Sequence, residues 1–488
     1  MVAFAVKIAT PTPPVPQRAD ATQRTTLRAI VELPNGADLR DLWEQPAGTE
    51  RVTEAVRRMR AANEAAVKEQ WSLVARKLPK DIQARVAEQL WINNSIVVDF
   101  DVTGPLDAAK EQLQAVLGWQ LLIAPVPEAG PLGEPIHSRP RTPEPPTSVP
   151  WNLDRLGAPE AHAAGHRGQG IRIGSIDMGV NVDHPEIAAA YAGRARDGSV
   201  DHNGHYFDPR GNATPGSPPC VAGDHGSMTI AHAVGANVGV APGATFDAAV
   251  VFSDEQGLSP VQNELQMRLE LLRSIQWMSA PVGADGSPNP AAAPHIVIDS
   301  WGVAPDTAQA TDRYLDSALR NVAAAGIVHV AAAGNWGGPG HLAYPADLET
   351  VIAVGAVDEL DQPVWGFSHG PSRSTDITKP DVAAPETNLT SILPAGGYRT
   401  YGHGGTSSGA PQIAGVLAVV NGALLARGEA PLDIRDARVA LRELSRDVYL
   451  PGPDTATGMG VPDLRRLDAT LATLTAERAR RAALKSPI

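Results

Sequence analysis

The 488-residue sequence predicts an α/β fold in which a mostly parallel sheet is flanked by helices. Two observations favour this class. From Trp151 onward, short apolar segments alternate with stretches of helical periodicity. Several of these segments are too apolar to face solvent on either side, which is typical of strands covered by helices on both faces. The composition, with 43% hydrophobic and 19% charged residues, is that of a globular chain long enough for two or three domains.

A smaller α/β unit is expected ahead of this sheet. Residues 1–26 are polar and rich in proline, which predicts a flexible tail. Residues 27–125 then follow the order strand, helix, strand, helix, strand, which describes a small α/β sandwich domain. The segments behind this order are 27–34, 51–77, 95–102, 106–118 and 119–125.

Residues 126–150 are dominated by proline, glycine and serine, so they predict an exposed linker that is open to cleavage. The main domain is expected over 151–470. Its predicted buried strands lie in IRIGSID, TFDAAVVFS, HIVIDSWG, GIVHVAAAGN and VIAVGAV. Residues 471–488 predict a C-terminal tail or frayed helix rich in alanine and arginine.

Charge and composition exclude several classes of protein. The net charge of −13, without a long basic run, argues against a nucleic-acid partner. Cys220 is the single cysteine, so neither an intramolecular disulfide nor a cysteine-based zinc site can form. The longest apolar run, 413–426, is too short for a membrane span. The N-terminus carries no recognisable signal peptide, which leaves the compartment open.

A glycine- and serine-rich stretch, GHGGTSSGAPQIAG, offers two alternative nucleophilic serines, Ser407 and Ser408. Its GTSSG core matches the G-x-S-x-G elbow of an α/β-hydrolase. That elbow requires a histidine later in the chain, and no histidine follows His403. The remaining interpretation is a serine at the start of a buried helix, served by an acid and a histidine that lie upstream.

Three upstream residues suit such a serine. Asp177 ends an apolar strand, where a carboxylate needs a partner. His225 precedes a helix and could bind this carboxylate through one ring nitrogen and a serine hydroxyl through the other, as a general base does. Asn335 ends another apolar strand, and its amide could donate to a developing oxyanion, an interaction of about 3 kcal/mol.

These segments resemble those of the subtilisin-like serine peptidases, the subtilases. The family's D-x-G, H-G-x, A-G-N and G-T-S-x-x-x-P motifs fall on Asp177, His225, Asn335 and Ser407, and the likeness spans nearly all of 151–470. The resemblance implies a subtilisin-like three-layer domain and a serine endopeptidase that works through an acyl-enzyme. The chain departs from the family pattern in the helix after His225, and in Gly409 and Glu386, where alanine and glycine are usual.

The resemblance also implies how substrates bind. Subtilases hold a polypeptide as an added strand, so main-chain hydrogen bonds give affinity and side-chain pockets give specificity. The expected substrate-binding residues are Ser300, Trp301 and Gly302 on one rim, Ala331 and Gly334 on the opposite wall, and Ala343 near the pocket floor. Trp301 could equally be a core residue.

The 27–125 unit resembles the family's inhibitory propeptide, a ferredoxin-like sandwich. Autocleavage is then expected within 126–150, with the propeptide acting as an intramolecular inhibitor and folding aid. The resemblance implies a monomer that requires no cofactor, and a structural calcium ion would be in keeping with it. A zinc site from His202, His205, Asp208, His225 and His232 is a weaker alternative, because their spacing fits no compact ligand motif.

Two other functions remain as alternatives. One is an inert pseudo-peptidase that binds peptides without cleaving them, since the sequence around His225 is unusual. The other, a lipase or esterase, lacks the downstream histidine. Replacement of Ser407 with alanine separates these alternatives.

Overall fold

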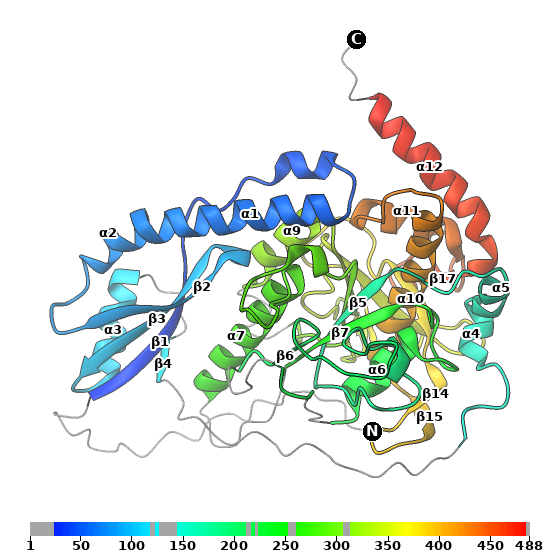
Figure 1. The fold of residues 1–488 in the computed structure, drawn as a ribbon, viewed down its shortest axis with the longest axis horizontal. Coiled ribbons are helices and arrows are strands. Elements are labelled where there is room, and N and C mark those ends of the chain that lie inside the picture. Colours follow the sequence, from blue (N-terminus) through cyan, green and yellow to red (C-terminus); the bar gives the residue numbers. More distant parts are fainter. Residues whose placement is uncertain are drawn as a thin grey trace.

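The computed structural model describes residues 24–117, 123–125, 144–210, 216–219, 223–251, 260–305 and 313–484. They form two units, a small N-terminal sheet with its helices and a larger unit beside it (Figure 1). The elements of the N-terminal unit are β1 (Arg24–Glu32), a 3-10 turn (Arg40–Glu44), α1 (Thr49–Ala66), a π turn (Val67–Trp71), α2 (Ser72–Ala75), β2 (Gln83–Leu90), a 3-10 turn (Trp91–Asn93), β3 (Ser95–Thr103), α3 (Leu106–Leu117) and β4 (Ile123–Pro125).

The N-terminal sheet is antiparallel in the strand order β2-β3-β1-β4. Together with α1 and α3, this order gives the βαββαβ arrangement of a ferredoxin-like sandwich. Period-2 alternation divides β3 between two faces: Phe100 packs under the helices of its own unit, whereas Val97 faces the larger unit. The sheet therefore serves two cores at once.

The larger unit is built on a seven-stranded parallel sheet in the order β13-β11-β9-β8-β5-β7-β6. Its strands are β5 (Arg172–Asp177), β6 (Tyr206–Phe207), β7 (Thr245–Val250), β8 (Ile296–Asp299), β9 (Val328–Ala332), β11 (Val351–Val357) and β13 (Val382–Pro385). Its helices are α4 (Trp151–Arg155), α5 (Ala158–Ala163), α6 (His225–Val234), α7 (Pro260–Ser279), α9 (Asp316–Ala325), α10 (Thr406–Ala426), α11 (Ile434–Leu444) and α12 (Leu467–Ala483).

Short pieces complete this unit. They are the strands β10 (Gly338–Pro339), β12 (Ser368–His369), β14 (Thr387–Ile392), β15 (Tyr398–His403), β16 (Ser445–Arg446) and β17 (Val461–Pro462), and the 3-10 turns Ala188–Ala190, Pro290–Ala292 and Leu464–Arg466. The antiparallel hairpin β14-β15 leads directly into α10. It therefore determines where that helix begins.

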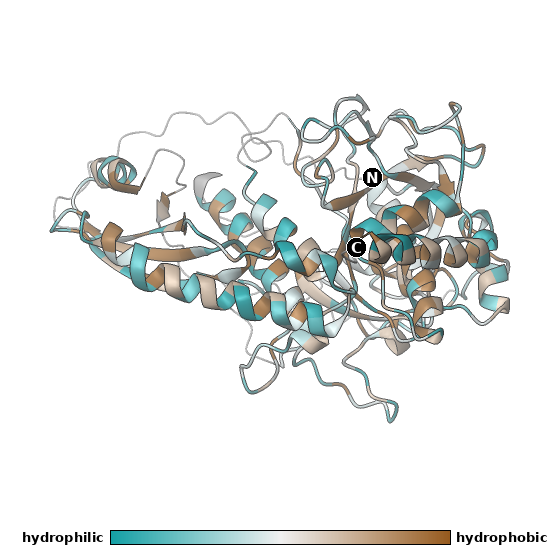
Figure 2. Cartoon of the chain, turned by 90° about the horizontal axis from the view of Figure 1, so that it is seen from above, coloured by the Kyte–Doolittle hydropathy of each residue, from teal (hydrophilic) through white to brown (hydrophobic). Residues whose placement is uncertain are grey.

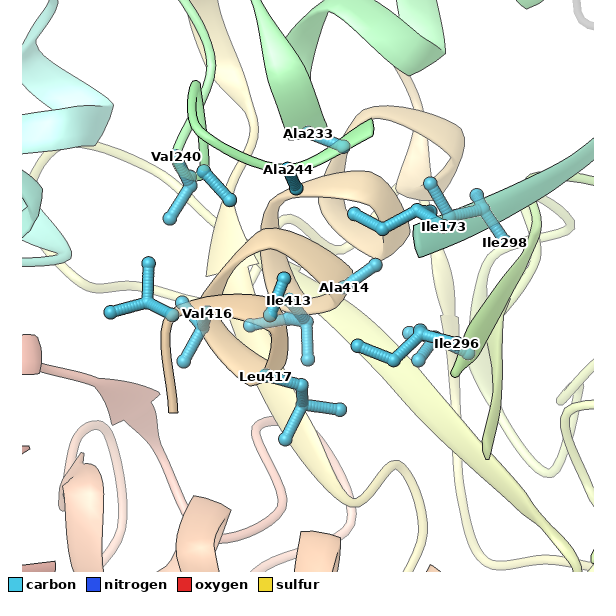
Figure 3. Packing of buried hydrophobic residues seen from close by; sticks show 14 of the residues in the cluster. Ile173, Ala233, Val240, Ala244, Ile296, Ile298, Ile413, Ala414, Val416 and Leu417 are labelled. Atoms are coloured by element: carbon cyan, nitrogen blue, oxygen red, sulfur yellow. The ribbon is translucent and has the colours of Figure 1, made fainter. Parts of the chain in front are cut away.

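Helices cover both faces of the parallel sheet. On one face α10 packs against α6 and the strands, and Ile413 and Leu417 meet Ile173, Ile296 and neighbouring side chains (Figure 3). On the other face α7 and α9 form a core that also takes in residues of α1 and β3. Hydrophobic residues run along the strands, while the outer helices carry both kinds (Figure 2). This three-layer arrangement confirms the predicted fold class.

α10 is long and apolar enough to cross a membrane by length and composition, but 83% of its most apolar window is buried inside the fold. It is thus accounted for as the central core helix. Its length exceeds the apolar run seen in the sequence because small residues such as Ser408 and Gly409 extend the buried stretch toward the N-terminus.

The predicted linker 126–150 lies mostly outside the described residues, as do Cys220 and residues 1–23 of the predicted tail 1–26. The last three residues of that predicted tail, 24–26, instead belong to β1, where they pair with β3. At the C-terminus, α12 continues to Ala483, so most of the expected tail is an ordered helix. Leu471 and Leu474 explain this, because both are buried against the main core.

Candidate active site

Three strands of the parallel sheet deliver polar residues to one edge. β5 ends at Asp177, β8 ends just before Ser300, and β9 ends three residues before Asn335. These strands are neighbours in the order β9-β8-β5, and the carboxyl ends of parallel strands meet at the same edge. α10, whose first turn carries Ser407, packs against β8 and β9. The candidate residues therefore gather although they are far apart in sequence.

Asp177 and His225 form a hydrogen-bonded pair. His225 Nδ1 lies 2.7 Å from Asp177 Oδ1, and Asp177 is only 4% exposed. The Thr229 hydroxyl donates to the other carboxylate oxygen at 3.0 Å, and the Met178 amide donates to Oδ1 at 2.7 Å. These contacts fix the carboxylate, which in turn fixes the orientation of the imidazole ring.

The surroundings of His225 act on its pKa in two directions. Burial of the ring lowers the pKa, while the charge of Asp177 and the hydrogen bond to it raise it. The net result is a pKa above the ordinary value of 6.5. Stabilisation of the imidazolium is the property that a general base needs when it takes a proton.

Ser407 sits in the first turn of α10 and is 7% exposed. Its Oγ donates to the Ser300 carbonyl at 2.9 Å, and Ser300 Oγ donates back to the Ser407 carbonyl at 2.9 Å. Within the described part of the chain, Ser407 is thus bonded to Ser300 and not to His225. The adjacent Ser408 is 1% exposed, and its hydroxyl has no hydrogen-bond partner among the described residues.

Asn335 is oriented by the residue that precedes the serine. The backbone amide and the hydroxyl of Thr406 both donate to Asn335 Oδ1 at 3.0 Å. With Oδ1 so engaged, the Nδ2 group faces Gly405, where an added Cβ would approach it to 2.9 Å. Gly405 also has a φ of 79°, so both space and backbone conformation require glycine.

The expected substrate-binding residues lie on paired segments. Val303 and Tyr344 exchange two backbone hydrogen bonds, which brings the chain after Gly302 alongside Ala343. A Cβ on Gly302 would come within 2.6 Å of the Ala343 Cβ, so the two backbones pack closely. Trp301 is half-buried and packs against the core.

The opposite wall is set by β9. Ala331 lies within this strand and is fully buried in the core that α7 and α9 cover. Gly334 follows the strand, and a Cβ there would meet the Trp336 ring at 2.7 Å. The Ala331 side chain therefore belongs to the core. The part of this wall that lies next to Asn335 is the backbone at Gly334.

The acidic and histidine side chains are the possible metal ligands of the described residues. In the described ranges, no group of three or more His, Cys, Asp or Glu residues is placed to hold a metal ion. The histidines of the weaker zinc interpretation have separate partners: His205 bonds Asp247 at 2.8 Å, His202 bonds the Tyr191 hydroxyl at 3.0 Å, and His232 is fully buried in α6. Burial lowers the pKa of His232 to about 4.

Two residues of the site were not foreseen from the sequence, Thr229 and Thr406. Thr229 follows His225 by four positions, so helical spacing places both on one face, a signal that the sequence does contain. Thr406 belongs to the G-T-S motif, but its partner Asn335 lies 71 positions away, so the motif does not reveal their contact.

Comparisons with known proteins identify the family of this chain. Residues 168–459 match the Subtilase family, peptidase S8. Bacillopeptidase F of Bacillus subtilis (strain 168) is 31% identical over 329 residues, which are 64% of this chain and 21% of that protein. Subtilisin Savinase of Lederbergia lenta is 28% identical over 279 residues, 56% of this chain and 84% of that protein. M-protease of Shouchella clausii (strain KSM-K16) is 28% identical over 279 residues, 60% of its own length.

The structure of the prenylagaramide maturation protease PagA superposes with a TM-score of 0.47 and 23% identity. The superposition covers 66% of this chain and 99% of that chain. The family match extends over more than half of the present sequence and includes Asp177, His225, Asn335 and Ser407. The chain therefore belongs to the subtilase family, peptidase S8.

Proposed function

We propose that this chain is a serine endopeptidase in which Ser407 is the nucleophile, His225 the general base and Asp177 the residue that orients it. The hydrogen bond of 2.7 Å between His225 Nδ1 and Asp177 Oδ1 carries this proposal. It leaves the other ring nitrogen to accept a proton from Ser407. The proposed substrates are polypeptides, laid along the segments that contain Ser300, Trp301, Gly302 and Gly334.

In the proposed reaction, Ser407 Oγ turns about its side-chain bond from Ser300 toward His225 when substrate binds. His225 takes the hydroxyl proton as the oxygen attacks the peptide carbonyl, and it returns this proton to the leaving amine. Asn335 Nδ2 and the Ser407 backbone amide stabilise the oxyanion, helped by the positive end of α10. Water then hydrolyses the acyl-enzyme by the same route. The rate should rise as the pH passes upward through the His225 pKa, above 6.5.

We further propose that the N-terminal unit is the propeptide of a self-processing zymogen and that cleavage falls within 126–150. Its docking supports this role. Arg273 of α7 bonds Glu88 of β2 at 2.5 Å, and Asn321 of α9 donates to the Ile92 carbonyl at 2.7 Å. Such a contact can template the helices on which it rests. A monomer without a required cofactor completes the proposal, and a structural calcium ion is compatible with it.

The test replaces Ser407 with alanine and, as a matched control, the adjacent Ser408 with alanine. We expect Ser407→Ala to lower casein hydrolysis by at least about 10³-fold and to abolish processing of the linker, because the nucleophile is lost. Ser408→Ala should retain both activities, since its hydroxyl bonds nothing among the described residues. Activity is followed with labelled casein and processing by mass spectrometry of the purified chain.

Two outcomes would contradict the proposal. Retention of both activities in Ser407→Ala would show that another residue is the nucleophile. A wild-type chain that binds peptides but neither hydrolyses casein nor reacts with a fluorophosphonate would favour the inert pseudo-peptidase. The Ser407–Ser300 hydrogen bond favours that alternative, as does the unusual sequence around His225.

A further inference from the structure

Glu386 is a buried carboxyl beside the candidate nucleophile. It follows β13 directly and is 0% exposed. Neither of its oxygens has a hydrogen-bond partner among the described residues. The nearest basic side chain among the described residues is that of His403, whose Nδ1 lies 3.8 Å from Glu386 Oε2 and which is 51% exposed. A carboxyl so placed is costly when charged, so its position calls for a physical explanation.

The carboxyl borders the turn that begins α10. A Cβ added to Gly404 would lie 3.4 Å from Glu386 Oε1 and 2.2 Å from Ser408 Oγ, so this carboxyl, the turn and the hydroxyl converge. The next residue, Gly405, contacts Asn335 on its other side. Glu386 therefore touches the backbone that positions the proposed nucleophile and the proposed oxyanion donor.

Burial governs the protonation state of Glu386. It raises the pKa to about 8, while the backbone amides of Gly404 and Gly405 lower it in part. Those amides approach the carboxyl without reaching the geometry of full hydrogen bonds. The group is thus a neutral acid at pH 7, and mildly alkaline solution ionises it.

The other charged groups around Glu386 do not neutralise it. From the segment after β11 comes Glu359, which accepts from Thr387 at 2.7 Å, a contact that lowers its pKa and keeps it ionised. The Arg155 guanidinium of α4 donates to the Glu359 carbonyl at 2.7 Å and to the Asp361 carboxylate at 3.0 Å. α10 contributes uncharged residues, including Ser408. Among the described residues, His403 on β15 is the remaining basic side chain close to Glu386.

We propose that Glu386 is a positioning residue for Ser407: as a neutral acid it lets the turn Gly404–Thr406 hold the serine in place, and as a carboxylate it draws the two glycine amides toward itself and displaces the serine. The inference rests on the proposed function, because it concerns the nucleophile of that reaction. The proposal predicts that activity falls reversibly at alkaline pH and that the ionisation of Glu386 causes this fall.

The test compares the rate at which a fluorophosphonate labels Ser407, and kcat/KM on a peptide substrate, between pH 6 and 10. In wild type both should fall about tenfold per pH unit above the Glu386 transition. Glu386→Gln keeps the shape but cannot ionise, so its rates should stay level to higher pH. Glu386→Gly should behave likewise. An alkaline limit that persists unchanged in Glu386→Gln would overturn the proposal.

Two matched variants exclude neighbouring groups as the cause. Glu359→Gln removes a carboxylate bonded to the same segment, and His403→Asn removes the nearby imidazole. Both should keep the alkaline limit of wild type. Loss of that limit in His403→Asn together with its retention in Glu386→Gln would assign it to the histidine instead.

Thermal unfolding tests Glu386 without relying on catalysis. A raised pKa means that the folded chain binds the proton more tightly than the unfolded chain, so wild-type stability should fall as the pH rises from the ordinary carboxyl value of 4.5 to about 8. The Tm of Glu386→Gln relative to wild type should therefore increase across this range. A constant difference would contradict the buried ionisation. Failure of wild type to label would refute the proposed function alone, since the Tm comparison still decides the state of Glu386.

Discussion

The Asn335 amide is held in place before any substrate arrives. Thr406 contributes two donors to its oxygen, and Gly405 leaves room for its nitrogen. A donor that is already oriented does not have to be reorganised as charge develops, and this is the main advantage of a fixed oxyanion site. Thr406 thus contributes indirectly to the proposed transition state, because it orients the Asn335 amide that would donate to the oxyanion.

We predict that Asn335→Ala lowers kcat by about 10²-fold, a loss of about 3 kcal/mol, because one oxyanion donor is removed. KM should change little, since the bond is made only in the transition state. Steady-state kinetics on a chromogenic peptide measure both constants. Asn203→Ala is the control, because the Asn203 amide bonds Asp201 at the surface. A raised KM with an unchanged kcat would show that Asn335 binds substrate instead.

At the level of residues, the sequence was informative where function coincides with the end of an element. Asp177 and His225 could be paired because a charge at a strand end needs a partner, and the structure has a hydrogen bond between them. The contact of Ser407 with Ser300 could not be foreseen, since it depends on a side-chain rotation. Nor could the burial of Glu386, because a glutamate is almost never fully buried unless it is paired.

Among the elements, α6 is placed by a close backbone contact at its first turn. A Cβ on Gly226 would lie 2.1 Å from the Gly179 carbonyl and 3.2 Å from the Asp177 Cβ. Only a residue without a side chain lets the helix approach the end of β5 so closely. The helix must approach this far for His225 to reach Asp177.

We predict that Gly226→Ala pushes the start of α6 away from β5 and costs about 1–3 kcal/mol in the free energy of unfolding. Labelling of Ser407 by a fluorophosphonate should slow markedly, because His225 moves with the helix. Gly402→Ala is the matched control, since an added Cβ there meets nothing within 4 Å. Chemical denaturation and labelling rates are the measurements. Equal rates for the two variants would refute the role of this contact.

Element by element, strongly patterned segments were predicted and weakly patterned ones were not. The alternation in 95–102 and the helical stripe in 106–118 gave β3 and α3 nearly to the residue. β2 was missed because its residues are exposed or half-buried along most of its length, so little hydrophobic contrast marks it. The helix expected over 51–77 contains a π turn at 67–71, which side-chain periodicity does not reveal.

At the scale of the whole molecule, the two units share a core. Leu42 and Val56 of the N-terminal unit pack in the same hydrophobic cluster as Leu319 of α9. In Figure 1, α1 reaches from the small sheet across α9 toward α11. Arg51 of α1 is 1% exposed within this interface. Packing and the buried Arg51 therefore help to anchor the N-terminal unit, together with the Arg273–Glu88 pair and the Asn321–Ile92 hydrogen bond.

Arg51 binds the end of one helix and the start of another. Its guanidinium donates to the Ala324 carbonyl at 2.8 Å, at the last turn of α9, and to Asp433 at 3.3 Å, the N-cap of α11. Carbonyls at a helix C-terminus favour a cation, so both contacts are electrostatically suited to it. Burial lowers the pKa of Arg51, and Asp433 opposes that effect.

We predict that Arg51→Ala weakens the docking of the N-terminal unit by about 3 kcal/mol, because buried carbonyls and Asp433 lose their donor. After linker cleavage this loss would raise the dissociation constant of the unit about 10²-fold, since 1.4 kcal/mol corresponds to a factor of ten. If that unit is the inhibitor, the processed variant should be more active at low concentration than processed wild type. Arg57→Ala should change docking by less than about 1 kcal/mol, because this side chain of the same helix is 66% exposed and pairs with Glu54 among the described residues. Size-exclusion chromatography of the cleaved chain, with casein hydrolysis of each fraction, measures both effects. The comparison uses a dilution at which the cleaved fragments of wild type and of Arg57→Ala still elute together. If the cleaved Arg51→Ala fragments also elute together at this dilution, the cation does not anchor the unit.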